Sequence, residues 1–213
     1  MNLSKKIFAY IKITRPLNVL ITFLVVVVAI LISQNERTDL CTILLASIAA
    51  SLVAAAGNIV NDIYDIESDK ISHPDRVLVL GTLNKTEVKL EYLILNFISA
   101  IISINLSQTL FAIVFISALL LFIYSAYLKK IPLIGNIVIA LLTGLAFIYG
   151  GFASGTPVAA IVPAVFAFLI NLIREIVKDI QDIKGDTKAG VITFPIKFGF
   201  KKSKILILII TIS

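Results

Sequence analysis

Long apolar stretches alternate with short polar ones along most of the chain. Apolar stretches of roughly 17–25 residues are typical of transmembrane helices. The pattern predicts six complete spans and the start of a seventh, at residues 17–33, 40–60, 92–108, 109–128, 133–152, 158–177 and 205–212. We therefore predict an all-α fold, a polytopic transmembrane helical bundle that forms a single domain over residues 1–213.

The last apolar stretch is much shorter than the others. It covers residues 205–212, well below the roughly 20 residues that a helix needs to cross a bilayer. We therefore expect the sequence to be a C-terminally truncated part of a longer protein. The first span is not expected to be a signal peptide, because its apolar run is too long and no small-residue cleavage site follows it.

Composition and charge agree with a membrane protein. The chain is 59% hydrophobic and 15% charged, whereas soluble domains are about 45–50% apolar and about 25% charged. The net charge of +6 is explained by topology, since every lysine and arginine except Arg37 falls on one side when the N-terminus is cytoplasmic. We predict a multi-pass protein of the cell membrane, with no nucleic-acid partner. The single cysteine excludes an intramolecular disulfide framework.

A cluster of carboxylates begins at the end of the second span. On a helix, Asn61, Asp65 and Asp69 fall at i, i+4 and i+8 and share one face, with Asp62 beside them. Carboxylates stacked in this way repel one another unless a cation lies among them. A divalent ion with oxygen ligands, most simply Mg²⁺, would supply that charge.

A second cluster follows the sixth span. Asp179, Asp182 and Asp186 have the same i, i+3, i+7 spacing as the three aspartates of the first cluster. Both clusters lie on the cytoplasmic side in the predicted topology, so two helices can present acidic faces to each other. Mg²⁺ favours one or two carboxylates together with substrate phosphates, and a diphosphate bridged by such ions fits this arrangement. The repetition makes ordinary solvated helix ends the weaker interpretation.

Basic and polar side chains on the same side are candidates for binding a diphosphate. Arg174 and Lys178, at i and i+4, share a helix face. The remaining candidates are Arg76, Tyr124, Lys129, Lys130 and Asn171. Asn171 and Arg174 lie within a predicted span, where a polar group usually faces a cavity or a partner. An equally good interpretation of Lys129 and Lys130 is that they only set the orientation of the protein in the membrane.

The two clusters resemble the paired aspartate-rich motifs of the UbiA superfamily of intramembrane prenyltransferases. The first reads Asn61-Asp62-x-x-Asp65-x-x-x-Asp69 and the second Asp179-x-x-Asp182-x-x-x-Asp186. The segments 15–18, 124–130 and 132–136 fit as well, so the resemblance covers the whole chain. It implies a fold with nine spans. The loop at residues 73–81 departs from the arginine- and proline-rich sequence that often follows the first motif in this superfamily.

The resemblance implies an Mg²⁺-dependent enzyme. The second cluster is most similar to members that transfer a geranylgeranyl group from a polyprenyl diphosphate to geranylgeranylglyceryl phosphate in ether-lipid biosynthesis. An aromatic acceptor, 4-hydroxybenzoate or dihydroxynaphthoate, is the alternative, as in quinone biosynthesis. The metal ligands would be Asn61, Asp65, Asp69, Asp182 and Asp186, and the catalytic residues would be Asp62, Asp179, Arg174 and Lys178. Asp62 and Asp179 would join the two metal groups; the alternative, which the sequence leaves open, is that one of them orients the acceptor or takes its proton.

Two other function classes fit parts of the pattern. A cation transporter also places carboxylates in membrane helices, but usually near the midplane and not at the ends of the spans. A non-catalytic lipid-binding remnant is the other alternative. A CDP-alcohol phosphotransferase is disfavoured, because its Asp-Gly and Ala-Arg motif does not occur in the sequence.

Overall fold

The structure, a computed structural model, describes residues 3–34, 38–188 and 190–212. Every regular element in these ranges is helical. The α-helices are α1 (Leu3–Ile13), α2 (Pro16–Ser33), α3 (Leu40–Ser72), α4 (Lys85–Leu106), α5 (Gln108–Ala126), α6 (Ile134–Ala153), α7 (Ile161–Lys188), α8 (Phe194–Phe198) and α9 (Phe200–Ile212). Two short 3₁₀ helices, η1 (Leu128–Lys130) and η2 (Pro157–Ala160), lie in the connections. The predicted all-α bundle is thus confirmed.

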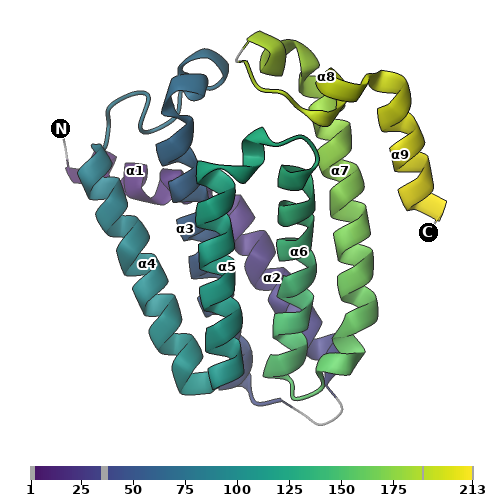
Figure 1. Cartoon of the computed structure of the whole chain (residues 1–213). Coiled ribbons are helices and arrows are strands. Elements are labelled where there is room, and N and C mark those ends of the chain that lie inside the picture. Colours follow the sequence, from purple (N-terminus) through teal and green to yellow (C-terminus); the bar gives the residue numbers. More distant parts are fainter. Residues whose placement is uncertain (1–2, 35–37, 189, 213) are drawn as a thin grey trace.

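The long helices form one bundle (Figure 1). Helix α3 packs against α2, α4 and α5, while α6 packs against α2 and α7. Helix α1 lies across one end of the bundle, where η1 and the C-terminal ends of α3 and α7 are also found (Figure 1). We call this the mouth end. The helices that carry the two acidic clusters therefore end on the same side of the molecule, as the sequence predicts.

Local sequence signals explain where several helices begin. Asp39 caps α3, because its carboxylate accepts a hydrogen bond from the backbone N–H of Thr42. Asn84 and Glu87 form a reciprocal capping box at the start of α4. Pro16 is the first residue of α2, a position where proline's missing N–H costs nothing. Helices α2 and α4 begin at the mouth end, so Pro16 and Asn84 help to shape the connections there, whereas α3 begins at the opposite end of the bundle.

Five helical segments are long and apolar enough to cross a membrane, at Pro16–Ser33, Leu40–Ser72, Gln108–Ala126, Ile134–Ala153 and Pro157–Ile183. They coincide with five of the six predicted spans. Helix α4 is not among them, although it runs beside α3 and α5 in the bundle. It also begins at Lys85, seven residues before the predicted start of the third span.

Two helices extend beyond the predicted ends of their spans, at residues 60 and 177, into segments that were expected to be polar loops. Residues 62–72 and 178–188 continue α3 and α7 beyond the predicted ends of their spans. Their charged residues continue the helical spacing, so the helix persists after the apolar run has ended. Arg37, the one basic residue predicted on the opposite side, lies outside the described residues.

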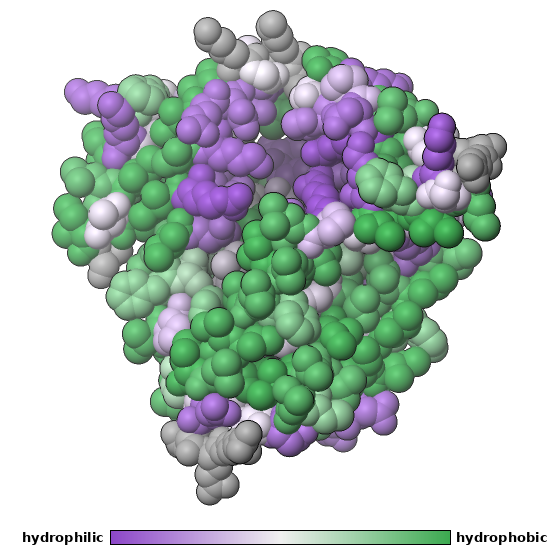
Figure 2. All heavy atoms as spheres, turned by 180° about the vertical axis from the view of Figure 1, so that it is seen from behind, coloured by the Kyte–Doolittle hydropathy of each residue, from purple (hydrophilic) through white to green (hydrophobic). Residues whose placement is uncertain are grey.

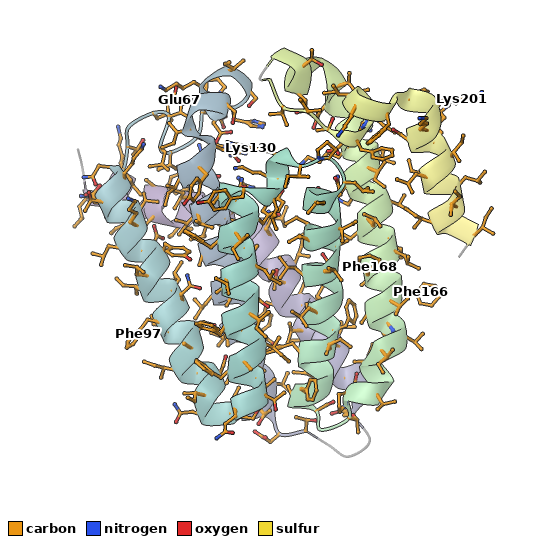
Figure 3. All side chains as sticks on the ribbon, viewed as in Figure 1. Glu67, Phe97, Lys130, Phe166, Phe168 and Lys201 are labelled. Atoms are coloured by element: carbon orange, nitrogen blue, oxygen red, sulfur yellow. The ribbon has the colours of Figure 1, made fainter. Side chains whose placement is uncertain are left out.

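The outer surface of the bundle is apolar. Phe97, Phe115 and Phe166 are about 59–67% exposed, and Phe97 and Phe166 point away from the bundle (Figure 3). Hydrophobic residues cover most of the surface below the mouth (Figure 2). A continuous apolar surface of this size marks contact with a membrane or a partner. Together with the candidate spans, it indicates a protein that lies in a lipid bilayer.

Small residues bring α2 and α6 into close contact. A Cβ atom at Gly150 of α6 would lie 2.5 Å from the Cβ of Ala29 and 3.1 Å from the backbone of α2. Neither group can move without shifting a helix. Such close approach through small residues is a common way of packing helices in membranes.

Gly150→Ala is therefore expected to destabilise the protein by about 1–3 kcal/mol, because the added methyl group overpacks the contact. Thermal unfolding followed by circular dichroism in detergent measures this. Gly185→Ala is the matched control, since a Cβ at this helical position meets nothing within 4 Å. Equal effects of the two substitutions would contradict the close contact between α2 and α6.

Candidate active site

The first acidic cluster lies on the last turns of α3, at the mouth end. Asn61 donates a hydrogen bond of 2.8 Å from its amide to Oδ2 of Asp65, so the predicted i, i+4 pair is formed. The side chains of Asp62 and Asp69 are only 6% exposed. Buried carboxylates need a charged or hydrogen-bonding partner, because desolvation otherwise disfavours their ionised form.

Two guanidinium groups provide those partners. Arg76, in the loop after α3, contacts Asp62 at 3.0 Å and Asp69 at 2.6 Å. Arg15 contacts the same oxygen of Asp62 at 2.5 Å. Arg15 holds a left-handed backbone conformation (φ 55°), which is costly for a non-glycine residue and often occurs at functional sites. The turn between α1 and α2 is therefore shaped to bring Arg15 to the acidic cluster.

Lys129 completes the neutralisation of the first cluster. Its ammonium group, on η1, lies 2.5 Å from Oδ1 of Asp65. Three aspartates of α3 thus face three cations from separate segments of the chain. Lys130 lies at the mouth end in Figure 3, but its side chain is exposed and forms no ion pair with any described residue.

The second cluster has few partners of its own. Asp179 accepts a 2.9 Å hydrogen bond from the amide of Asn136 on α6. Asp182 is exposed and Asp186 is half-buried, and neither pairs with a cation among the described side chains. Burial, together with the neighbouring negative charge of Asp182, raises the pKa of Asp186 above its ordinary value. These two carboxylates are therefore available to an added cation.

A cavity of about 670 Å³ opens beneath the mouth. Its size lies within the range of small-molecule pockets. One part is polar and includes Asn61, Tyr124, Asn171, Arg174 and Lys178, all predicted from the sequence as site residues. The other part is lined by aliphatic side chains of α2, α3, α5 and α6. In Figure 2, hydrophilic residues surround a hollow at the mouth end, and hydrophobic residues lie below it.

Tyr124 lines the cavity and lies near both acidic clusters. Its side chain lies within electrostatic range of Asp65 in the first cluster and of Asp179 in the second. On the α7 side, Asn171 donates a 2.9 Å hydrogen bond to Thr143 of α6, which fixes its amide at the cavity wall. The structure therefore brings Asn61 of the first cluster and Asn171 of α7 to one cavity, while the aspartates of both clusters lie outside its lining.

The sequence reasoning gave no role to three side chains at this site: Arg15, Asn136 and Glu175. Arg15 and Asn136 lie within segments on which the family resemblance rests. Their partners lie 47 and 43 positions away in the chain, so the sequence alone did not show the contacts. Glu175 could have been found from the sequence, because a carboxylate within a predicted span often marks a functional site.

The predicted metal ligands have suitable chemistry but are not gathered into one metal-binding group. Carboxylate and amide oxygens are the donors that Mg²⁺ prefers. In the part of the chain that the structure describes, no group of three or more His, Cys, Asp or Glu side chains is close enough to hold a metal ion. Arg15, Arg76 and Lys129 occupy the spaces between the carboxylates of α3. The donor set therefore fits a hard divalent cation, whose charge would take the place of those ion pairs.

Comparison with known proteins identifies the family. The model of the UbiA prenyltransferase family matches residues 19–213. The chain belongs to the UbiA prenyltransferase family. The predicted fold, family and enzyme class are thereby confirmed, and the protein is a membrane prenyltransferase.

Several curated relatives of this UbiA protein carry the same name. Digeranylgeranylglyceryl phosphate synthase of Methanosphaera stadtmanae is 36% identical over 203 residues, which cover 95% of this chain and 74% of the relative. The synthase of Thermococcus kodakarensis is 39% identical over 198 residues, covering 92% of this chain and 70% of the relative. The chain thus spans about three quarters or slightly less of these relatives.

Solved structures agree with the family assignment. A structure of a digeranylgeranylglyceryl phosphate synthase superposes with a TM-score of 0.87 and 35% identity, covering 97% of this chain and 74% of the neighbour. A UbiA homologue from Archaeoglobus fulgidus bound to GPP and Mg²⁺ superposes with a TM-score of 0.79 at 19% identity, covering 96% and 74%. The second likeness supports the fold alone.

Proposed function

We propose that this enzyme transfers a geranylgeranyl group from geranylgeranyl diphosphate to geranylgeranylglyceryl phosphate, in the synthesis of membrane ether lipids. The observation that carries the proposal is a single cavity with an acidic and cationic mouth and an aliphatic interior. A polyprenyl diphosphate has the same division into an anionic head and an apolar chain. The names of the relatives support the choice of donor and acceptor.

The mouth is suited to holding the diphosphate. Asn61, Asp65 and Asp69 would hold Mg²⁺ on the α3 side, and Asp182 and Asp186 would hold it on the α7 side. Bound Mg²⁺ supplies positive charge that stabilises the diphosphate as a leaving group. The solved A. fulgidus homologues with Mg²⁺ and prenyl diphosphates support a metal of this kind.

The cations of the chain complete the diphosphate site. Arg174 and Lys178 lie on the cavity wall. Arg76, Lys129 and Lys130 lie at the mouth, where the first two neutralise carboxylates of α3. With a metal held by these carboxylates, the same cations would be free to bind phosphate oxygens. Guanidinium and ammonium groups aimed at developing negative charge lower the barrier to departure of the diphosphate.

The aliphatic part of the cavity would hold the prenyl chain and exclude water. Breaking the allylic C–O bond leaves a carbocation-like carbon, which water would capture in an open site. Val53, Leu121 and Leu145 are among the side chains that surround this space. The C–O bond would thus break at the mouth, and the carbocation-like carbon would be protected from water in the adjacent aliphatic part of the same cavity.

We also propose that the mouth faces the cytoplasm. The positive-inside distribution of lysine and arginine supports this orientation. Charged substrates made in the cytoplasm would then reach the site from the mouth, while lipid substrates and products enter and leave through the surrounding bilayer.

Purified protein with Mg²⁺ and labelled geranylgeranyl diphosphate tests the reaction. Three acceptors are offered side by side: geranylgeranylglyceryl phosphate, 4-hydroxybenzoate and 1,4-dihydroxy-2-naphthoate. We expect prenylated product with the glyceryl phosphate and a rate at least about 100-fold lower with either aromatic, because a site built for one polar acceptor leaves groups unpaired with another. A preference for an aromatic acceptor would overturn the lipid assignment. Product analysis by mass spectrometry decides between them.

A further inference from the structure

One carboxylate of the cavity belongs to neither acidic cluster. Among the described residues that line the cavity, Glu175 is the only acidic one. The aspartates of both clusters lie at the mouth, outside the cavity lining. We propose that Glu175 is the general base that takes the proton from the acceptor hydroxyl during prenyl transfer. This inference rests on the proposed function, because it needs an acceptor that attacks through an O–H group.

Glu175 lies in the right place along α7. Asp186, Asp182, Asp179, Glu175 and Asn171 follow one another at intervals of three or four residues, so they share one face of the helix. Glu175 is one turn deeper than Asp179, on the inner side of the diphosphate site. The reacting carbon of a prenyl diphosphate lies next to its phosphates on the chain side. A carboxylate one turn inside the mouth therefore stands beside the bond that is made.

The contacts of Glu175 leave it able to accept a proton. Its side chain is 14% exposed, and its Oε1 lies 3.1 Å from Nη1 of Arg174. Arg174 is itself 70% exposed, and an exposed pair of this kind is weak. Oε2 of Glu175 makes no hydrogen bond to any residue that the structure describes. One oxygen thus contacts Arg174, while the other is free for the acceptor.

The two aspartates predicted as alternatives for this role have other partners. Asp62 is bound by the guanidinium groups of Arg15 and Arg76 and is almost fully buried. Asp179 accepts a hydrogen bond from the amide of Asn136, which sets its orientation. Neither lines the cavity. A proton acceptor must reach the hydroxyl that it deprotonates, and of these three carboxylates Glu175 best meets that condition.

In the proposed transfer, the C1–O bond of the prenyl diphosphate breaks, and its electron pair leaves with the diphosphate. A lone pair of the acceptor hydroxyl oxygen forms the new C–O bond at C1. The O–H proton passes to Oε2 of Glu175, which becomes a neutral carboxylic acid and later releases the proton to water. No oxidant or further reactant takes part.

Glu175→Gln tests the assignment, because it removes the base and keeps the shape. We expect transfer to geranylgeranylglyceryl phosphate to fall by about 100-fold or more, the usual contribution of general-base catalysis. Mg²⁺-dependent binding of geranylgeranyl diphosphate is expected to stay unchanged. Glu91→Gln on α4 is the matched control, since this residue is outside the cavity lining.

A thiol analogue of the acceptor shows whether Glu175 acts as a base or has a structural or cation-stabilising role. A thiol is far more acidic than an alcohol, so at a pH above the pKa of the free analogue most of it is already thiolate and needs no base. We expect Glu175→Gln to react with this analogue at close to the wild-type rate, with a C–S bond in the product. The same 100-fold defect with the thiol would overturn the inference, as would full activity of Glu175→Gln with the hydroxyl acceptor.

The proposed function fails in a different way. If the wild-type protein transfers no prenyl group to geranylgeranylglyceryl phosphate, the reaction assignment is wrong and the role of Glu175 is overturned with it. If the wild type is active and only the Glu175 results disagree, the reaction stands and the base lies elsewhere.

Discussion

Asp65→Asn and Asp182→Asn are each expected to lower prenyl transfer by roughly two to three orders of magnitude, the typical loss for one electrostatic group of an active site. Each substitution removes one negative charge and one proposed metal ligand from the mouth while keeping the side-chain shape. Asp65 lies on α3 and Asp182 on α7, so the two variants examine the two clusters separately. Initial rates with saturating Mg²⁺ and substrates measure the loss.

Asp75→Asn is the matched control for these variants. Asp75 lies in the loop after α3 near the same mouth, its side chain is 77% exposed, and its carboxylate is 4.0 Å from the ammonium group of Lys12. An exposed pair at this distance contributes little, so the control is expected to keep wild-type activity. Normal rates in Asp65→Asn or Asp182→Asn would contradict the assignment of that cluster to the active site.

Arg76→Ala is expected to cause the largest loss of stability. Among the described side chains, Arg76 alone contacts both Asp62 and Asp69, which are 6% exposed. Removing one partner of a buried ion pair leaves an uncompensated charge and costs about 3–5 kcal/mol. Thermal unfolding in detergent without Mg²⁺ measures the effect as a lower midpoint. Arg76→Lys should lose less stability than Arg76→Ala, because lysine keeps the positive charge.

Lys70→Ala is a suitable control for Arg76→Ala. Lys70 pairs with Glu67 at 2.8 Å on the same helix, but the two side chains are 54% and 84% exposed. Such a surface pair is worth about 0–1 kcal/mol. A similar loss in both variants would show that the Arg76 ion pairs are not stabilising the mouth. Combining Arg76→Ala with Asp69→Asn should recover part of the loss, since the buried charge is then removed.

Much of the fold follows from local patterns in the sequence. The apolar runs predict the spans, and the i, i+3, i+7 spacing of the aspartates predicts acidic helix faces. The ends of α3 and α7 were placed too early because hydropathy falls when a helix leaves the apolar region. The helix itself continues, since charged residues at helical spacing still form backbone hydrogen bonds. Helix boundaries are therefore less predictable than the helices.

The partners of the acidic side chains were much harder to predict. Arg15 reaches Asp62 across 47 positions and Lys129 reaches Asp65 across 64. These contacts depend on how α2, α3 and η1 pack, which no local pattern contains. Arg76 and Lys129 were predicted to bind the diphosphate, and the structure pairs them with carboxylates instead. Both roles use the same charge at the same place.

The distinction between mouth and cavity also needed the tertiary structure. Glu175 continues the helix face of Asp179, Asp182 and Asp186, so spacing in the sequence does not separate it from them. The structure separates them by depth: Glu175 lines the cavity, while Asp179, Asp182 and Asp186 lie at or near its mouth. In the proposed reaction, this difference in depth would place the aspartates near the diphosphate and Glu175 near the acceptor.

We propose that the acidic clusters of α3 and α7 form one diphosphate site. A double-mutant cycle of Asp65→Asn and Asp182→Asn tests it directly, with Mg²⁺-dependent binding of an unreactive thiolo-diphosphate analogue as the measurement. If both clusters hold the same metal–diphosphate group, the two losses of binding free energy will be non-additive by about 0.5–3 kcal/mol, as for residues that share a partner. Additive losses would mean that the clusters act independently, and the account of a single shared site would be wrong.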